Sequence, residues 1–152
     1  MLARDDAGAV AALSAAVDHF NVLAAADASA QELNLDLALA HFFWGEAEIG
    51  LHRLPAAALH LRQAEKRAGL PATPTKVDRE KVELYVRVQQ QRARLHRANG
   101  DYAAALRSLA EAQRVGEQWQ KLAPWEMERL RRKRVELESG SKRAIPEDDW
   151  LH

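Results

Sequence analysis

The 152-residue sequence contains no cysteine, which excludes disulfide frameworks, thiol catalysis and cysteine-based zinc sites. β-Branched residues are also scarce, because Val, Ile and Thr total 13 whereas Ala and Leu total 30 and 20. Ala and Leu cost the least free energy in a helix, and β-branched residues favour strands, so this composition predicts an all-α protein. The chain is long enough to bury a hydrophobic core without crosslinks.

The sequence also lacks the common motifs of catalysis. It has no phosphate-binding loop, no His-Glu-x-x-His motif and no serine nucleophile elbow. His41, Glu48 and His52 fall on one helix face, but His41 lies about 10 Å along the axis from Glu48, too far to share a metal ion with it. We therefore expect a protein that is not an enzyme and uses no cofactor and no metal. Glu48 and His52 are instead expected to form a hydrogen bond.

No apolar run approaches the roughly 18 residues that a membrane-spanning helix needs. The nearly apolar segment 7–17 follows Asp5 and Asp6, where a signal peptide would carry positive charge. Its apolar residues recur at helical spacing, which is typical of an amphipathic helix. We therefore expect a cytoplasmic protein without a membrane anchor.

Charge is balanced overall, with 22 basic and 22 acidic residues, but it is unevenly distributed. Residues 1–52 contain one basic and eight acidic residues, whereas residues 53–143 contain 21 basic and 11 acidic ones. Two interpretations are open. The acidic and basic parts complement each other within a molecule or between subunits, or the basic part binds an anionic partner.

Capping residues and apolar periodicity predict about six helices and no strand, over residues 4–26, 30–52, 55–68, 75–98, 102–121 and 124–138. Ser29 and Glu32 form a capping-box pattern, Pro55 suits a first helical turn, and Gly69 and Gly100 end helices. Short connections make consecutive helices antiparallel. We expect one domain, with an N-terminal capping helix (1–28), a first helix pair (30–69), a proline linker (70–74), a second pair (75–122), a C-terminal capping helix (124–139) and a polar tail (140–152).

Two segments repeat the same spacing of small and large apolar residues. The intervals are nine, three, four and three positions in both copies, which are Gly45, Leu54, Ala57, Leu61 and Ala64, and Ala93, Tyr102, Ala105, Leu109 and Ala112. Small residues let two helices approach closely, and large residues fill the space beside them. The copies lie 48 residues apart and predict two equivalent helix hairpins.

The segment 99–112, which begins Asn-Gly-Asp-Tyr, resembles the turn and second helix of the tetratricopeptide repeat family. The first copy departs from that pattern at its turn, and the spacing of 48 residues exceeds the family's period of about 34. The resemblance implies an all-α fold in which antiparallel helix hairpins stack as a short superhelix of about six helices, with the first and last as caps. It also implies a non-catalytic scaffold that binds a peptide or partner helix in a concave groove lined by the first helix of each pair.

A basic stripe on the helix 75–98 is the leading candidate for partner binding. Its members share one helix face, which the resemblance places in the groove: Arg87, Gln90, Arg94 and Arg97. These side chains suit an acidic peptide or a terminal carboxylate. On the helix 30–52, Phe42 and Glu46 belong to the matching stripe, where both an exposed apolar floor and ordinary core packing are open interpretations. The expected partner is therefore an acidic protein or peptide segment.

The strongest cationic cluster lies on the last helix, at Arg129, Arg131, Arg132, Lys133 and Arg134. It offers an alternative function, contact with nucleic-acid phosphates, although glutamates three and four residues away are salt-bridge partners. A third hypothesis is a homo-oligomer, in which the acidic first helix of one copy meets the basic face of another.

Overall fold

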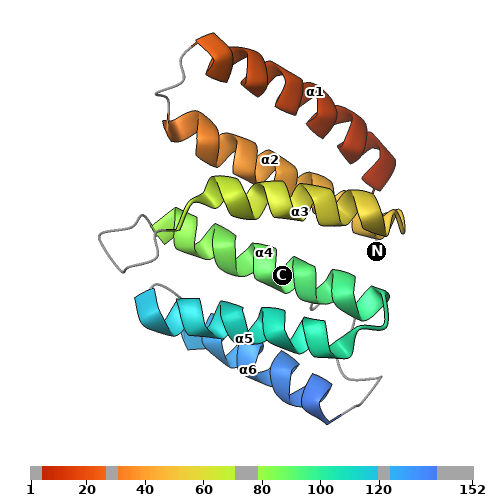
Figure 1. Ribbon diagram of the computed structural model, residues 1–152, viewed down its shortest axis with the longest axis vertical. Helices are drawn as coiled ribbons and strands as arrows, with labels where there is room; N and C mark the ends of the chain where they lie inside the picture. The colour runs from red at the N-terminus through yellow and green to blue at the C-terminus, as the bar shows by residue number, and fades with distance from the viewer. Residues whose placement is uncertain (1–4, 27–30, 71–78, 120–123, 140–152) are drawn as a thin grey trace. The chain divides into compact units, whose positions relative to one another are not determined.

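The computed structural model describes residues 5–26, 31–70, 79–119 and 124–139, and every regular element within these ranges is an α-helix. The six helices (Figure 1) are α1 (Asp6–Ala26), α2 (Gln31–Gly50), α3 (Leu54–Ala68), α4 (Arg79–Ala98), α5 (Tyr102–Trp119) and α6 (Pro124–Glu138). The predicted all-α fold and number of helices are therefore confirmed. Ser29 of the expected capping box, residues 75–78 and the tail 140–152 lie outside the described residues.

The chain divides into two compact units, Met1–Gly69 and Leu70–His152. In the first unit, α2 and α3 form an antiparallel hairpin and α1 packs against α2. In the second unit, α4 and α5 form the hairpin and α6 packs against α5. The sequence predicts one domain with a linker at 70–74, and the boundary between the two units falls at the first residue of that linker.

The first hairpin has its closest helix contact at Gly45 of α2. A Cβ atom at this position would lie 2.8 Å from Cδ2 of Leu61 on α3, so the absence of a side chain allows the two helices to approach. Ala57, Leu61 and Ala64 of α3 are fully buried. A small residue on one helix therefore faces a large apolar residue on the other, as the repeated spacing predicts.

Equivalent residues close the second hairpin. Ala93 stands 48 positions after Gly45, and it belongs to the hydrophobic core of the second unit together with Ala105, Leu109 and Ala112 of α5. All four side chains have no exposed surface. The spacing that repeats in the sequence thus marks the buried contact line, or seam, of both hairpins, except at its turn positions, where Leu54 is half-buried and Tyr102 is 41% exposed.

The two hairpins also share the geometry of their turns. The amide of Arg53 donates to the carbonyl oxygen five residues earlier at 2.9 Å, and the amide of Asp101 does the same at 2.9 Å. The preceding residue has a positive φ in both turns, 58° at His52 and 78° at Gly100. Glycine adopts such angles without steric cost, whereas histidine does not, so the second turn is the less strained of the two.

α1 differs from the other helices in how little of it is buried. Val17 is its buried residue and packs with Leu37 and Ala40 of α2, while Val22 and Leu23 are exposed. By length and composition alone, α1 is apolar enough to cross a membrane, a test that signal sequences and core helices of soluble proteins also pass. The expected absence of a membrane anchor stays a prediction.

Leu61 provides a direct test of the seam. We expect Leu61→Ala to lower the free energy of unfolding by about 2–5 kcal/mol, because it leaves a cavity at a fully buried position. Leu59→Ala is the matched control on the same helix, where the side chain is 50% exposed and the expected change is within about 0.5 kcal/mol. Urea unfolding of both variants measures the difference. Equal losses of unfolding free energy in the two variants would contradict the assignment of Leu61 to the seam.

Candidate functional site

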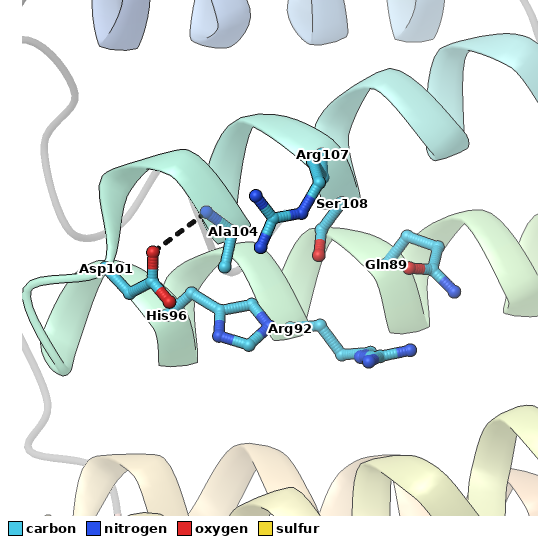
Figure 2. Close-up of a pocket in the computed structure, with 7 residues that line it drawn as sticks. All are labelled: Gln89, Arg92, His96, Asp101, Ala104, Arg107 and Ser108. Carbon is cyan, nitrogen blue, oxygen red and sulfur yellow. Dashed lines mark hydrogen bonds between the residues drawn. The ribbon is translucent and has the colours of Figure 1, made fainter.

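A pocket of about 360 Å³ opens between α4 and α5 in the second unit (Figure 2). Along each helix, successive lining residues are three or four positions apart, except for the adjacent pair Arg107 and Ser108, so each helix presents one face to the pocket. The lining consists of Gln89, Arg92 and His96 from α4, and Asp101, Ala104, Arg107 and Ser108 from the turn and the start of α5. Apart from Ala104, every one of these side chains is polar or charged, so the pocket suits a polar ligand.

The first turn of α5 borders the pocket. Oδ1 of Asp101 accepts a hydrogen bond of 3.0 Å from the amide of Ala104, which caps the helix (Figure 2). The amides of a first helical turn give this end of α5 a partial positive charge. A helix N-terminus and side chains from the neighbouring helix therefore face the same space, an arrangement that favours an anionic group.

Two arginines make the pocket electropositive. Arg92 and Arg107 line it from different helices, and Asp101, the acidic residue of the lining, is engaged in capping. Burial lowers the pKa of His96. Arg92 and Arg107 lower it further, and Asp101 opposes them. His96 is therefore neutral at pH 7 and becomes a third cation only at acidic pH.

Gln89 is a buried polar residue in the pocket wall. Its side chain is 3% exposed, and its Nε2 has no hydrogen-bond partner among the described residues. A buried donor without an acceptor costs about 1–3 kcal/mol. Because this nitrogen is itself buried, it does not present a donor to the open space of the pocket.

In the first hairpin, the equivalent space is filled by the chain's own aromatic rings. At an offset of 48 residues, Gln89, Arg92 and Ser108 correspond to His41, Trp44 and His60. The Trp44 ring stacks on His60 with centroids 3.8 Å apart, and Nδ1 of His41 lies 3.1 Å from Nδ1 of His60. Flexible or smaller polar side chains replace these three rings in the second hairpin, and the pocket lies where they would be.

The predicted basic stripe lies on a different face of α4 from the pocket. Arg87 is exposed and Arg97 is half-buried, but Gln90 and Arg94 between them are only 9% and 6% exposed. The reason is that α4 is covered on several sides, since its apolar residues are buried around most of its circumference. The four residues therefore do not form the continuous exposed surface expected of them, and the pocket lining includes none of them.

Phe42 of α2 is 1% exposed, so of its two open interpretations core packing holds and this side chain is not available to a partner, while Glu46 is half-buried. Glu48 accepts a hydrogen bond of 3.2 Å from Nε1 of Trp44, in place of the expected bond with His52, which is exposed. Sequence periodicity placed these residues on the helix correctly but did not show which neighbours cover them.

The cationic cluster of α6 is less continuous than its sequence suggests. Arg131 and Arg132 are exposed and Arg129 is half-buried, but Lys133 has no exposed surface. Arg134 donates to Glu138 and to Gln113 of α5, both at 3.1 Å. Because α6 packs against α5, part of the cluster belongs to that contact. The prediction that Lys133 contacts phosphate is therefore wrong. The prediction that the four arginines of the cluster contact phosphate stays a prediction.

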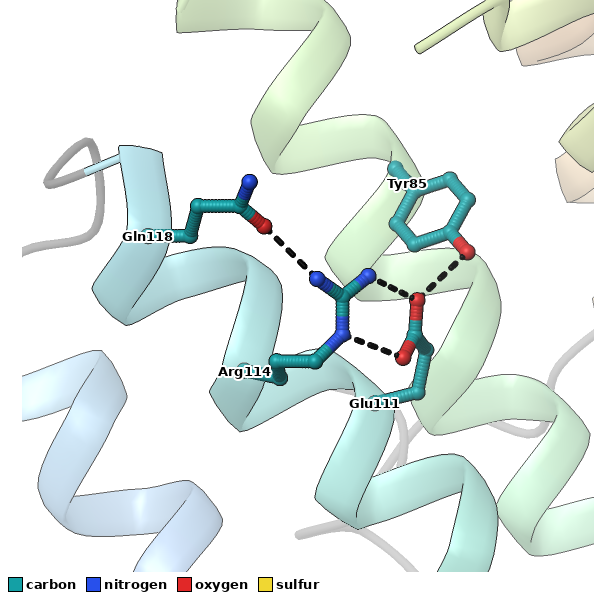
Figure 3. Close-up of polar contacts among 4 residues, drawn as sticks. All are labelled: Tyr85, Glu111, Arg114 and Gln118. Carbon is teal, nitrogen blue, oxygen red and sulfur yellow. Dashed lines mark hydrogen bonds and ion pairs between the residues drawn. The ribbon is translucent and has the colours of Figure 1, made fainter. Parts of the chain in front are cut away.

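A polar network also links α4 to α5 (Figure 3), and it lies farther from the α4–α5 turn than the pocket does. The hydroxyl of Tyr85 donates to Oε1 of Glu111 at 3.0 Å, and Arg114 donates to both oxygens of this carboxylate at 2.7 and 2.8 Å. Nη1 of Arg114 also donates to Gln118 at 2.6 Å. The hydrogen bond from Arg114 lowers the pKa of Glu111, burial opposes this, and the bond from Tyr85 lowers it further. The network thus fixes the two helices that form the pocket.

Tyr85→Phe removes this link while keeping the ring. We expect a loss of about 1 kcal/mol in the free energy of unfolding near pH 7. The pKa of Glu111 is lower in the folded chain, so the carboxylate's contribution is present at neutral pH and is lost as pH falls below 4.5. The loss caused by Tyr85→Phe should therefore shrink in acid.

Tyr102→Phe is the control for this measurement, because the Tyr102 side chain is 41% exposed. Its effect on urea unfolding should stay within about 0.5 kcal/mol at every pH. A Tyr85→Phe loss that does not change between pH 7 and pH 3.5 would mean that the network contributes nothing through Glu111.

Comparison with known proteins finds no match to the chain. No family model fits the sequence, and no curated protein or solved structure is significantly similar to it. The resemblance to tetratricopeptide repeats therefore rests on the residues of the two hairpins alone, and the function has to be argued from the pocket.

Proposed function

We propose that this protein is a non-catalytic, cytoplasmic interaction module that binds an acidic segment of a partner protein, with a carboxylate of that segment in the α4–α5 pocket. The observation that carries the proposal is the placement of Arg92 and Arg107 on different walls of one pocket. The two arginines outnumber Asp101, the acidic residue of the lining, so the lining carries a net positive charge. An anion that enters it would therefore be attracted from two sides.

The pocket supplies directional contacts as well as charge. A guanidinium group binds a carboxylate through two parallel hydrogen bonds, which a lysine cannot do. Ser108, which also lines the pocket, adds a hydroxyl donor. The lining thus offers donors from both α4 and α5, so that binding depends on the geometry of the hairpin.

The equivalence of the two hairpins supports a scaffold. Both have the same spacing along the seam and the same turn, an organisation that resembles tetratricopeptide repeats, whose common role is to present a binding surface. The resemblance concerns the hairpins alone, and the pocket supplies the chemistry of recognition.

The pocket also contains the residue types of a nucleophilic triad, namely Ser108, His96 and Asp101. A triad requires that the histidine be hydrogen-bonded to both other groups. Asp101 is instead bonded to the amide of Ala104, and no hydrogen bond joins His96 to Ser108 or Asp101 in the described part of the chain. We therefore favour anion binding over hydrolysis.

The double variant Arg92→Gln/Arg107→Gln tests this site. We expect it to weaken binding of an acidic peptide by at least about tenfold, since charge-assisted hydrogen bonds contribute about 1.5–3 kcal/mol each. A peptide array selects the best acidic binder, and fluorescence anisotropy with the labelled peptide measures Kd. Circular dichroism confirms that the variant keeps its helices.

The matched control is Arg87→Gln/Arg97→Gln, which removes the two accessible charges of the predicted stripe on α4. Its Kd should stay within about twofold of the wild type, because neither residue lines the pocket. Loss of binding in this control alone would place the partner on the stripe. Equal losses in both variants would show attraction to net charge and would contradict a defined site.

A pH titration tests the part played by His96. Its pKa is lowered in the free protein, so binding of an anion should tighten as pH falls from 7.5 to 5 and the imidazole gains a proton. His96→Gln should keep the affinity measured at pH 7.5 and lose this increase. An unchanged pH profile in His96→Gln would mean that the bound anion does not contact this side of the pocket.

A further inference from the structure

In the first unit, two histidines form a contact that the proposed function does not use. Nδ1 of His41 on α2 lies 3.1 Å from Nδ1 of His60 on α3, while the ring centroids are 5.3 Å apart and the ring planes differ by 22°. The centroid distance exceeds the Nδ1–Nδ1 distance by about twice the distance from the centre of an imidazole ring to one of its atoms. The two nitrogens therefore point at each other, which is the geometry of an N–H···N hydrogen bond between imidazoles.

This geometry does not fit a metal site. The two nitrogens point at each other instead of toward a common third point, so their lone pairs are not both directed at one metal ion. Among the described residues, no group of three or more His, Asp or Glu side chains is arranged to hold a metal ion. The number of protons that the two rings carry therefore decides whether this hydrogen bond can form.

Contact between the two Nδ1 atoms limits the protons that the pair accepts. In the neutral pair, one Nδ1 donates and the other accepts. One further proton makes one ring an imidazolium, which still donates to its neutral partner. A second further proton would place two N–H donors and two positive charges head-on at 3.1 Å. The hydrogen bond between α2 and α3 thus exists in the first two states and is impossible in the third.

The surroundings of the pair favour His60 for the first extra proton. The face of Trp44 covers His60 at a centroid distance of 3.8 Å, and an aromatic face attracts a cation. Burial lowers the pKa of His60, but Glu48 opposes this lowering. Glu48 itself is 4% exposed, accepts from Nε1 of Trp44 at 3.2 Å and lies 3.8 Å from Nη1 of Arg53.

His41 resists protonation more strongly. Its side chain is 8% exposed, and burial, together with His60 and Arg67 of α3, lowers its pKa to about 4. Arg67 also donates to Asn34 of α2 at 3.4 Å. The second extra proton therefore meets a buried ring beside two groups that disfavour positive charge.

α1 is the other helix packed against α2, and it carries four titratable groups among its described residues and their flank. Asp5 accepts a hydrogen bond from the amide of Gly8 at 2.9 Å, Asp6 lies beside Gly50, and Asp18 and His19 are exposed. The charged neighbours that influence the protonation of the pair are thus Glu48, Arg53 and Arg67.

We propose that the His41–His60 pair is a pH-responsive lock of the α2–α3 hairpin, closed while the pair carries no extra proton or one, and opened by the second. Both histidines have pKa values below 6.5 in the folded chain. Their contribution to stability is therefore complete above pH 6.5 and declines as pH falls toward 4. The lock lies in the first unit and does not depend on the function proposed for the second.

The chain itself supplies the matched substitution, because Gln89 and Ser108 are the equivalents of His41 and His60 in the second hairpin. We expect the urea midpoint of the wild type to fall between pH 6.5 and 4, and that of His41→Gln/His60→Ser to fall by less than half as much. His19→Gln removes an exposed histidine of α1 and should behave as the wild type. His96 is present in all three chains and contributes equally. An equal fall in the double variant would overturn the proposal.

A measurement on the unsubstituted chain keeps the proposal testable if the double variant does not fold. Imidazole ¹⁵N NMR of the full chain, followed from pH 7.5 to 4, should show Nδ1 of His41 and His60 changing together, as coupled sites do. A ¹⁹F label on tryptophan, assigned with Trp44→Phe, should show Trp44 leaving its stacked position only in the last step. Independent titration of the two rings with an unchanged Trp44 signal would contradict the lock.

Discussion

Close approach of two helices at a residue without a long side chain is the constraint on which both hairpins depend. Gly45 faces Leu61 in the first hairpin, and Ala93 packs with Leu109 in the second. Because a larger residue at either position would force the helices apart, every other contact between the paired helices presupposes this seam. The shared turn, with its positive φ, then brings each second helix back along the first.

Because both hairpins have the same seam, the side chains beside the seam can be compared at equivalent positions. One side of the first hairpin is closed by the Trp44–His60 stack and the His41–His60 hydrogen bond, whereas the equivalent side of the second hairpin is a pocket lined with Arg92. The same backbone arrangement thus supports an internal polar contact in one unit and, in the other, a polar pocket that we propose binds an external anion. The replacement of aromatic rings by longer or smaller polar side chains accounts for this difference without any change in the hairpin.

The sequence predicted the helices and the seam well, because these depend on local signals such as Gly69, Gly100 and the repeated apolar spacing. It failed for Arg94 and left Phe42 undecided, since periodicity along one helix does not show how many of its sides are covered. The pocket was missed for a different reason, because its lining comes from two helices and no single stretch of sequence contains it. Comparison of residues 48 positions apart would have found it, as three aromatic rings of the first copy are polar in the second.

The most direct test of this account is to map the binding of an acidic peptide on the full chain by ¹H–¹⁵N NMR. The account predicts that the largest shift changes occur in the amides of Gln89, Arg92 and His96 and in the first turns of α5. It also predicts that the equivalent positions of the first hairpin, where the space is filled, do not respond. Shift changes confined to α6, or to the face of α4 that carries Arg87, would contradict it.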